Sequence, residues 1–143
     1  MIEIDLDDAL ETIVKNLNDG AQRSTSFRQS LDLEPALYPT CAYRGASGAK
    51  CFIGMLIDDN DYNPTWYSMG YSVLDLLEKT ITVYGSNDEF TNRDALVELQ
   101  NIHDEQDNWD LVDQRTTFNT TGWKSLRTWA NDYRVGWPQD DAE

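Results

Sequence analysis

The residue types best suited to chemistry gather in one stretch of the sequence, residues 41–57. This stretch contains both cysteines of the chain, three of its eight glycines and two cationic residues, and it has no aspartate or glutamate. Its net charge is +2, whereas residues 1–40 carry −5 and residues 58–143 carry −12. Two cations in a chain whose net charge is −15 indicate a local site for an anion.

Two glycines and two cations lie at the centre of this stretch, in the order Arg44, Gly45, Gly48 and Lys50. Glycines allow backbone N–H groups to converge on one point, arginine offers a planar fork of donors, and lysine offers a point charge. The pattern therefore predicts a cradle for a carboxylate or phosphate, although it lacks the spacing of a P-loop. The alternative is an ordinary turn whose cations pair with acidic residues of the same chain.

The two cysteines and the single histidine are the residues that could hold a metal ion. Zinc sites use four ligands, commonly with two cysteines close together, but nine residues separate Cys41 from Cys51. A site made of both cysteines, His103 and one aspartate is therefore not favoured, and no cofactor is expected. A disulfide between the cysteines is a second possibility. The favoured interpretation is two small, buried thiols.

His103 and Asp104 form the only pair that resembles a general base with its carboxylate. A hydrolase would also need a nucleophile, and Ser47, Cys41 and Cys51 qualify by residue type alone. A histidine in the last turn of a helix more commonly interacts with free carbonyl groups. No catalytic residue is assigned on this basis, and an enzyme is not the favoured class.

The spacing of apolar residues predicts the elements that position these side chains. We expect helices over residues 5–18, 25–33, 72–79, 92–105 and 122–133, with Gly20 and Thr91 as caps. A β-hairpin is expected with strands at 41–44 and 49–53 around the turn Gly45–Gly48, and a further strand at 81–84. The apolar run 53–57 either extends the hairpin or begins a buried helix, and residues 34–40 and 107–120 are expected to be loops. The predicted fold is a mainly helical α+β domain over residues 1–138, with a flexible acidic tail at 139–143.

Composition excludes several classes of protein. An apolar content of 40% and five tryptophans are unlike a disordered chain, and no apolar run is long enough to span a membrane. The acidic start of the chain lacks the basic and apolar segments of a secretory signal, so a cytoplasmic protein is expected. The net charge disfavours direct binding to nucleic acids or anionic membranes. A basic protein surface or a small anionic ligand is the expected partner.

Two motifs of the sequence suggest a family. The first is C-x-Y-R-G-x-x-G-x-K-C-x-I-G-x-L-I-x-D-x-x-Y, from Cys41 to Tyr62, and the second is L-Q-x-I-H-D, which ends at Asp104. With these two motifs the chain resembles a group of small proteins encoded mostly by tailed bacteriophages. The resemblance implies an N-terminal helix, a cysteine-bounded glycine loop, a later helix and a tryptophan-bearing C-terminal helix. It also implies an accessory protein made in the cytoplasm of the infected bacterium, and it implies no particular mechanism.

The polar residues of the two motifs could share one site, if the hairpin meets the end of the 92–105 helix. This hypothesis assigns ligand binding to Arg44, Gly45, Gly48, Lys50, Asp59, Tyr62 and His103.

Several functions follow as alternatives. The favoured one is stoichiometric binding to host or defence machinery, through an anionic or nucleotide-like ligand at the Cys41–Cys51 loop. The others are an acidic DNA mimic that inhibits a basic host protein, a small hydrolase that uses His103 and Asp104, and a structural module of a virion.

Overall fold

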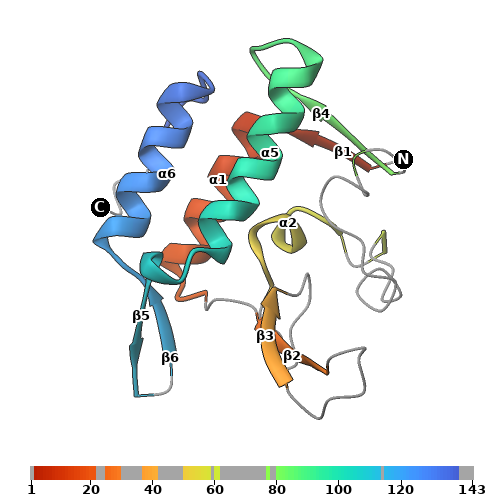
Figure 1. Ribbon diagram of the computed structural model, residues 1–143. Helices are drawn as coiled ribbons and strands as arrows, with labels where there is room; N and C mark the ends of the chain where they lie inside the picture. Colours follow the sequence, from red (N-terminus) through yellow and green to blue (C-terminus); the bar gives the residue numbers. More distant parts are fainter. Residues whose placement is uncertain are drawn as a thin grey trace.

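Three helices form the frame of the protein in the computed structural model: α1 (Leu6–Asn18), α5 (Glu89–Asp104) and α6 (Thr120–Asp132) (Figure 1). The structure describes residues 2–21, 25–29, 37–41, 50–58, 60–61, 77, 80–113 and 115–138, with the backbone alone for 25–29 and 37–41. A short helix, α2 (Phe52–Met55), and a 3-10 turn, η1 (Gln106–Asn108), complete the helical part. The fold is α+β and mainly helical, as the sequence predicts.

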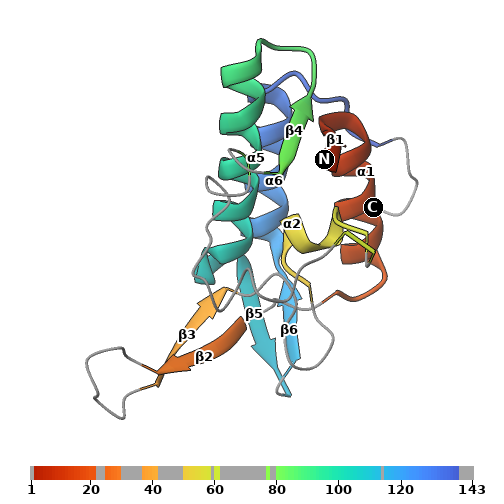
Figure 2. The ribbon, with the colours of Figure 1, turned by 90° about the vertical axis from the view of Figure 1, so that its right-hand side faces the viewer.

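Three pairs of strands accompany the helices. β1 (Ile2–Asp5) and β4 (Ile81–Tyr84) are parallel, with Ile2 opposite Ile81. β2 (Thr25–Gln29) and β3 (Leu37–Cys41) are antiparallel, as are β5 (Trp109–Val112) and β6 (Arg115–Phe118). The two antiparallel pairs lie at the end of the molecule opposite β1 and β4 (Figures 1 and 2).

Helix α1 follows from local sequence alone. The Asp5 carboxylate accepts hydrogen bonds from the N–H groups of Asp7 (2.9 Å) and Asp8 (3.3 Å), which caps the first turn. Gly20 ends the helix region with φ of +93°, the left-handed conformation that favours glycine. The side chains at three- and four-residue spacing are all buried, as predicted: Leu6, Ala9, Leu10, Ile13, Val14 and Leu17.

The caps of α5 and α6 are side chains that accept from the N–H three residues ahead. Asp88 caps α5, because its carboxylate accepts from the Thr91 N–H at 2.8 Å, so the prediction that Thr91 is the cap is wrong by one turn. Asn119 caps α6 by accepting from the Gly122 N–H at 2.8 Å. Both helices begin two or three residues earlier than predicted.

Helix α2 closes the core between the longer helices. Phe52 and Ile53 are fully buried, and α2 contacts both α1 and α5. The apolar run at 53–57 therefore begins in a helix. The predicted strand at 49–53 is wrong at Phe52 and Ile53, because burial of these side chains against two helices stabilises a helical turn.

Several predicted elements differ in the structure because strand pairing overrides local pattern. The helix predicted at 25–33 is wrong, since residues 25–29 form β2. The loops predicted at 34–40 and 107–120 are also wrong, since they contain β3 and the β5–β6 hairpin. In that hairpin Trp109 lies opposite Phe118, and both are buried at its base.

Three predicted segments fall wholly or largely outside the described residues. They are the turn Gly45–Gly48, the tail 139–143 and the helix at 72–79. Of the helix predicted at 72–79, Leu77 is described; it is helical and buried.

Candidate functional site

The residues predicted to bind a ligand are described in part. Lys50 and His103 lie within the described residues, whereas Arg44, Gly45, Gly48, Asp59 and Tyr62 lie outside them. The anion cradle and the shared site therefore stay predictions. The structure does show where the C-terminal end of the 41–57 stretch lies.

The end of this stretch meets the end of α5. The backbone N–H of Ile53 donates to Gln100 Oε1 at 3.2 Å, and the Phe52 ring lies 5.1 Å from the His103 ring, centroid to centroid. Gln100 Nε2 in turn donates to Asp104 Oδ1 at 2.9 Å. The described ends of the two sequence motifs, 41–62 and 99–104, are therefore in contact.

Gln100 is the residue of this junction to which the sequence analysis gave no role. It is 6% exposed and uses both ends of its amide, one toward α2 and one toward Asp104. A glutamine on the buried face of α5 was the available signal, because a buried amide requires hydrogen-bond partners.

His103 is fully buried, with 0% of its side chain exposed. Its Nδ1 lies 3.0 Å from Asp104 Oδ1, and its ring makes edge contacts with Phe52 and Trp109. The Trp109 indole N–H donates to the backbone carbonyl of His103 at 2.9 Å. These contacts make His103 part of the packed core. A general base has to reach its substrate, and the described neighbours of His103 hold the ring away from solvent.

Cys51 is a free, buried thiol that stabilises the start of α2. Its Sγ accepts from the Gly54 N–H at 3.3 Å, in the way that a serine oxygen caps a helix. Of Cys41 only the backbone is described, at the end of β3. Among the described residues, no three histidine, cysteine or carboxylate side chains are arranged to hold a metal ion.

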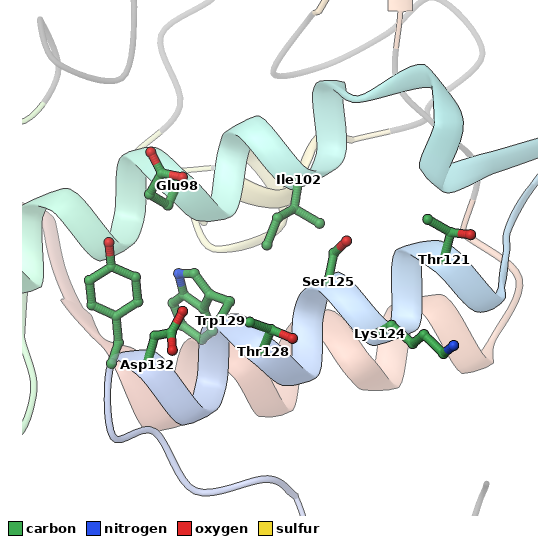
Figure 3. Close-up of a pocket in the computed structure, with 9 residues that line it drawn as sticks. Glu98, Ile102, Thr121, Lys124, Ser125, Thr128, Trp129 and Asp132 are labelled. Carbon is green, nitrogen blue, oxygen red and sulfur yellow. The ribbon is translucent and has the colours of Figure 1, made fainter.

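A groove of about 410 Å³ lies between α5 and α6 (Figure 3). Trp129 lies at its base, buried, and its indole N–H donates to the Ala95 carbonyl at 2.8 Å. Tyr133 packs against Trp129, with 5.8 Å between the ring centroids. The groove is lined by Glu98, Ile102, Thr121, Lys124, Ser125, Thr128, Trp129, Asp132 and Tyr133.

The sequence analysis missed this groove, although α6 carries a signal for it. Thr121, Ser125, Thr128 and Asp132 recur at spacings of four and three residues, which places them on one face of the helix. The apolar pattern of the same helix drew attention to its buried face.

The groove is polarised along its length. Glu98 of α5 and Asp132 of α6 lie on either side of Trp129, while Lys124 lies toward the other end and points away (Figure 3). Burial raises the pKa of the Tyr133 phenol above its usual 10.0, and the negative charges of Glu98, Asp94 and Asp132 raise this pKa further. One end of the groove is therefore negative.

The carboxylates of the described residues face solvent almost without exception. Asp104 is half-buried, and none of the exposed carboxylates pairs with a lysine or arginine within the described ranges. The exposed carboxylates are Glu3, Asp5, Asp7, Asp8, Glu11, Asp19, Asp58, Asp61, Asp88, Glu89, Asp94, Glu98, Glu105, Asp107, Asp110, Asp113 and Asp132.

The fold and surface together define an acidic α+β protein with a groove between two helices and, over the described residues, many exposed carboxylates. The chain matches no family model, no curated protein and no solved structure. Within the described residues, no helix is long and apolar enough to cross a membrane.

Proposed function

We propose that the protein is a phage-type accessory protein that binds a basic protein of the host or of its defence machinery, one to one, as an acidic mimic of DNA. The carrying observation is that the exposed carboxylates of the described residues pair with no lysine or arginine among those residues. Carboxylates that are not neutralised within their own chain project a negative field into solvent, and this field attracts and orients a basic partner.

The helices distribute this charge over the molecule. Asp7, Asp8 and Glu11 are exposed on α1, and Asp94 and Glu98 are exposed on α5. Since these carboxylates stand on regular helices, their positions are fixed relative to one another before binding. A fixed array of negative groups is what a DNA-binding surface recognises when it contacts phosphates.

The β5–β6 hairpin supplies apolar area for the same partner. Leu111 is 73% exposed and Val112 is 57% exposed, and Asp110 and Asp113 flank them. Apolar contacts of this kind add affinity that charge alone does not give in salt.

Two further observations support this class of function. The burial of His103 favours a packing role for it, which weakens the hydrolase alternative. The contact between α2 and α5 joins the described ends of the two motifs on which the resemblance is based, which supports a shared role for them.

The test is capture of the partner from a bacterial lysate with the tagged full chain, followed by titration of the purified partner. We expect binding that weakens steeply with added salt, because the contact is electrostatic. The triple variant Asp7→Asn, Asp8→Asn, Glu11→Gln should weaken binding and make its salt dependence shallower. Partner binding that salt leaves unchanged would overturn the proposal.

A small anionic ligand at the Cys41–Cys51 loop is the second candidate. It is supported by the position of Lys50, which is half-buried directly before the anchored helix α2. Native mass spectrometry of the protein purified from cells would detect a retained ligand. Arg44→Ala and Lys50→Ala should abolish that binding with little effect on folding, whereas the acidic mimic should bind its partner regardless of both changes.

A further inference from the structure

The negative end of the α5–α6 groove has the chemistry of a site for an organic cation. Glu98 and Asp132 come from different helices and lie on either side of Trp129 (Figure 3), whose ring packs against that of Tyr133. Asp94 lies one turn before Glu98 on α5. Neither Glu98 nor Asp132 pairs with a lysine or arginine of the described chain, so the groove lacks an internal counter-charge there.

The walls of the groove hold these groups in place. The hydrogen bond from the Trp129 indole to Ala95 fixes the ring between the two helices. Asn101 Nδ2 donates to Glu98 Oε1 at 3.3 Å, and the Tyr133 carbonyl accepts from Asn87 Nδ2 at 2.7 Å. A site held by its own hydrogen bonds loses little entropy when a ligand binds.

Size and composition select the class of cation. A volume of about 410 Å³ falls within the range of small-molecule sites and greatly exceeds a single ion. Calcium would need six to eight oxygen ligands around one point, whereas this groove combines two flanking carboxylates with aromatic and aliphatic side chains. An ammonium or guanidinium group on an aliphatic stem suits this lining. Its charge would pair with the carboxylates, and its stem would pack against the apolar side chains of the wall.

The same helix already shows such a contact elsewhere. The guanidinium carbon of Arg127 lies 4.1 Å from the centre of a Trp137 ring. The protein therefore already pairs a guanidinium group of α6 with an aromatic ring that follows the helix, outside the groove.

We propose that the α5–α6 groove binds an alkylammonium or guanidinium group, held between Glu98 and Asp132 and against Tyr133. The group comes either from a lysine or arginine side chain of the partner or from a free polyamine. The inference rests on the proposed function in so far as it locates one contact of a basic partner on this chain.

The experiment follows the Trp129 indole N–H and the Tyr133 amide by NMR in the full chain. The probes are a blocked arginine peptide, the same peptide with uncharged citrulline, and spermidine. We expect the two cationic probes to shift these signals and the citrulline peptide to bind at least tenfold more weakly. The tighter of the two cationic probes identifies the source of the group.

Matched variants separate a site from general attraction to an acidic protein. Glu98→Gln and Asp132→Asn should each weaken probe binding about tenfold, because each removes a charge-assisted hydrogen bond. Glu3→Gln on β1 removes the same charge outside the groove and should change binding less than about twofold. All three side chains are exposed, so the fold should tolerate the changes.

The outcomes distinguish this inference from the proposed function. Equal binding of the citrulline peptide, or equal weakening by Glu3→Gln, overturns the groove site. If the captured partner still binds Glu98→Gln and Asp132→Asn at full affinity and the probes do not bind, the groove inference fails and the acidic mimic stands. If the probes bind the groove and no basic partner is captured, the proposed function fails and the cation site stands.

Discussion

His103 illustrates how a residue with catalytic chemistry can serve the core. Its ring is enclosed by Phe52 and Trp109, and its Nδ1 is directed at Asp104, so removal of the ring leaves a cavity beside a carboxylate that has lost a partner. Such a role predicts a loss of stability on substitution, whereas a catalytic role predicts a loss of turnover with the fold intact.

His103→Ala should lower the free energy of unfolding by about 2–4 kcal/mol, because a buried ring is replaced by a void. Urea denaturation followed by tryptophan fluorescence measures this change. Gln106→Ala, three residues on and exposed, is the control and should stay within about 0.5 kcal/mol of the parent. Unchanged stability in His103→Ala would contradict the packing role.

Asp88, at the start of α5, makes a pH-dependent contribution to the stability of the folded state. Its hydrogen bonds with Thr91, first from the backbone and then from the side chain, lower the pKa of the Asp88 carboxyl below its usual 3.8. The folded state therefore favours ionised Asp88. This part of the stability is present above pH 3.8, the pKa of the carboxyl in the unfolded chain. It is lost as the pH falls through the lower pKa that the carboxyl has in the folded state.

Asp88→Ala should lower the thermal midpoint at neutral pH, and Asp88→Asn should retain most of it, because asparagine still accepts from the Thr91 N–H. The advantage of the parent over Asp88→Asn should shrink as the pH of the melts falls below 3.8 and disappear below the lower pKa of the folded state. An advantage that persists unchanged in acid would show that ionisation of Asp88 does not contribute.

At the scale of elements, the contact between α6 and the β5–β6 hairpin depends on a glycine. A Cβ on Gly122 would lie 2.6 Å from Phe118 Cε1 and 2.7 Å from the backbone oxygen of Asn108. Phe118 also packs on Trp109 and Trp123, so the ring has little freedom to move. The absence of a side chain at Gly122 allows the first turn of α6 to lie against η1 and the hairpin.

Gly122→Ala should therefore lower the free energy of unfolding by about 1–3 kcal/mol through overpacking, in spite of the higher helix propensity of alanine. Chemical denaturation measures it. Gly136→Ala is the matched control, because a Cβ there meets no atom within 4 Å and should change stability by less than about 0.5 kcal/mol. A stabilised Gly122→Ala would mean that α6 can shift away from the hairpin at little cost.

Elements were predictable where one segment contains its own signal. The buried face of α1, its end at Gly20 and the strand at 81–84 were all predicted in this way. The strands β2 and β3 were not predicted, because each depends on a partner at least eight residues away. Thr25 pairs with Cys41, and Gln29 pairs with Leu37. Local periodicity carries no information on such pairing.

At the scale of the whole molecule, the negative surface opposes folding as well as attracting a partner. A net charge of −15, with exposed carboxylates throughout the described residues, creates self-repulsion in the compact state. Added salt screens this repulsion: at 0.1 M ionic strength, charges more than about 10 Å apart interact only weakly. The free protein and its complex should therefore respond to salt in opposite directions.

The thermal midpoint of the free protein should rise as sodium chloride increases at neutral pH. The same series near the isoelectric point, about pH 4.2, serves as the control, because the net repulsion vanishes there and the salt effect should shrink. A midpoint that falls with salt at neutral pH would indicate that attractive charge pairs dominate the surface.

The sequence alone determined the charge balance, the amphipathic helix α1, the approximate extent of α5 and α6 and the α+β class. These properties depend on composition and on spacing within one segment. The tertiary structure decided the pairing of β2 with β3, the burial of His103 and the groove between α5 and α6. Each of these depends on which distant residues come into contact, and a local pattern cannot specify that contact because many arrangements bury the same apolar faces.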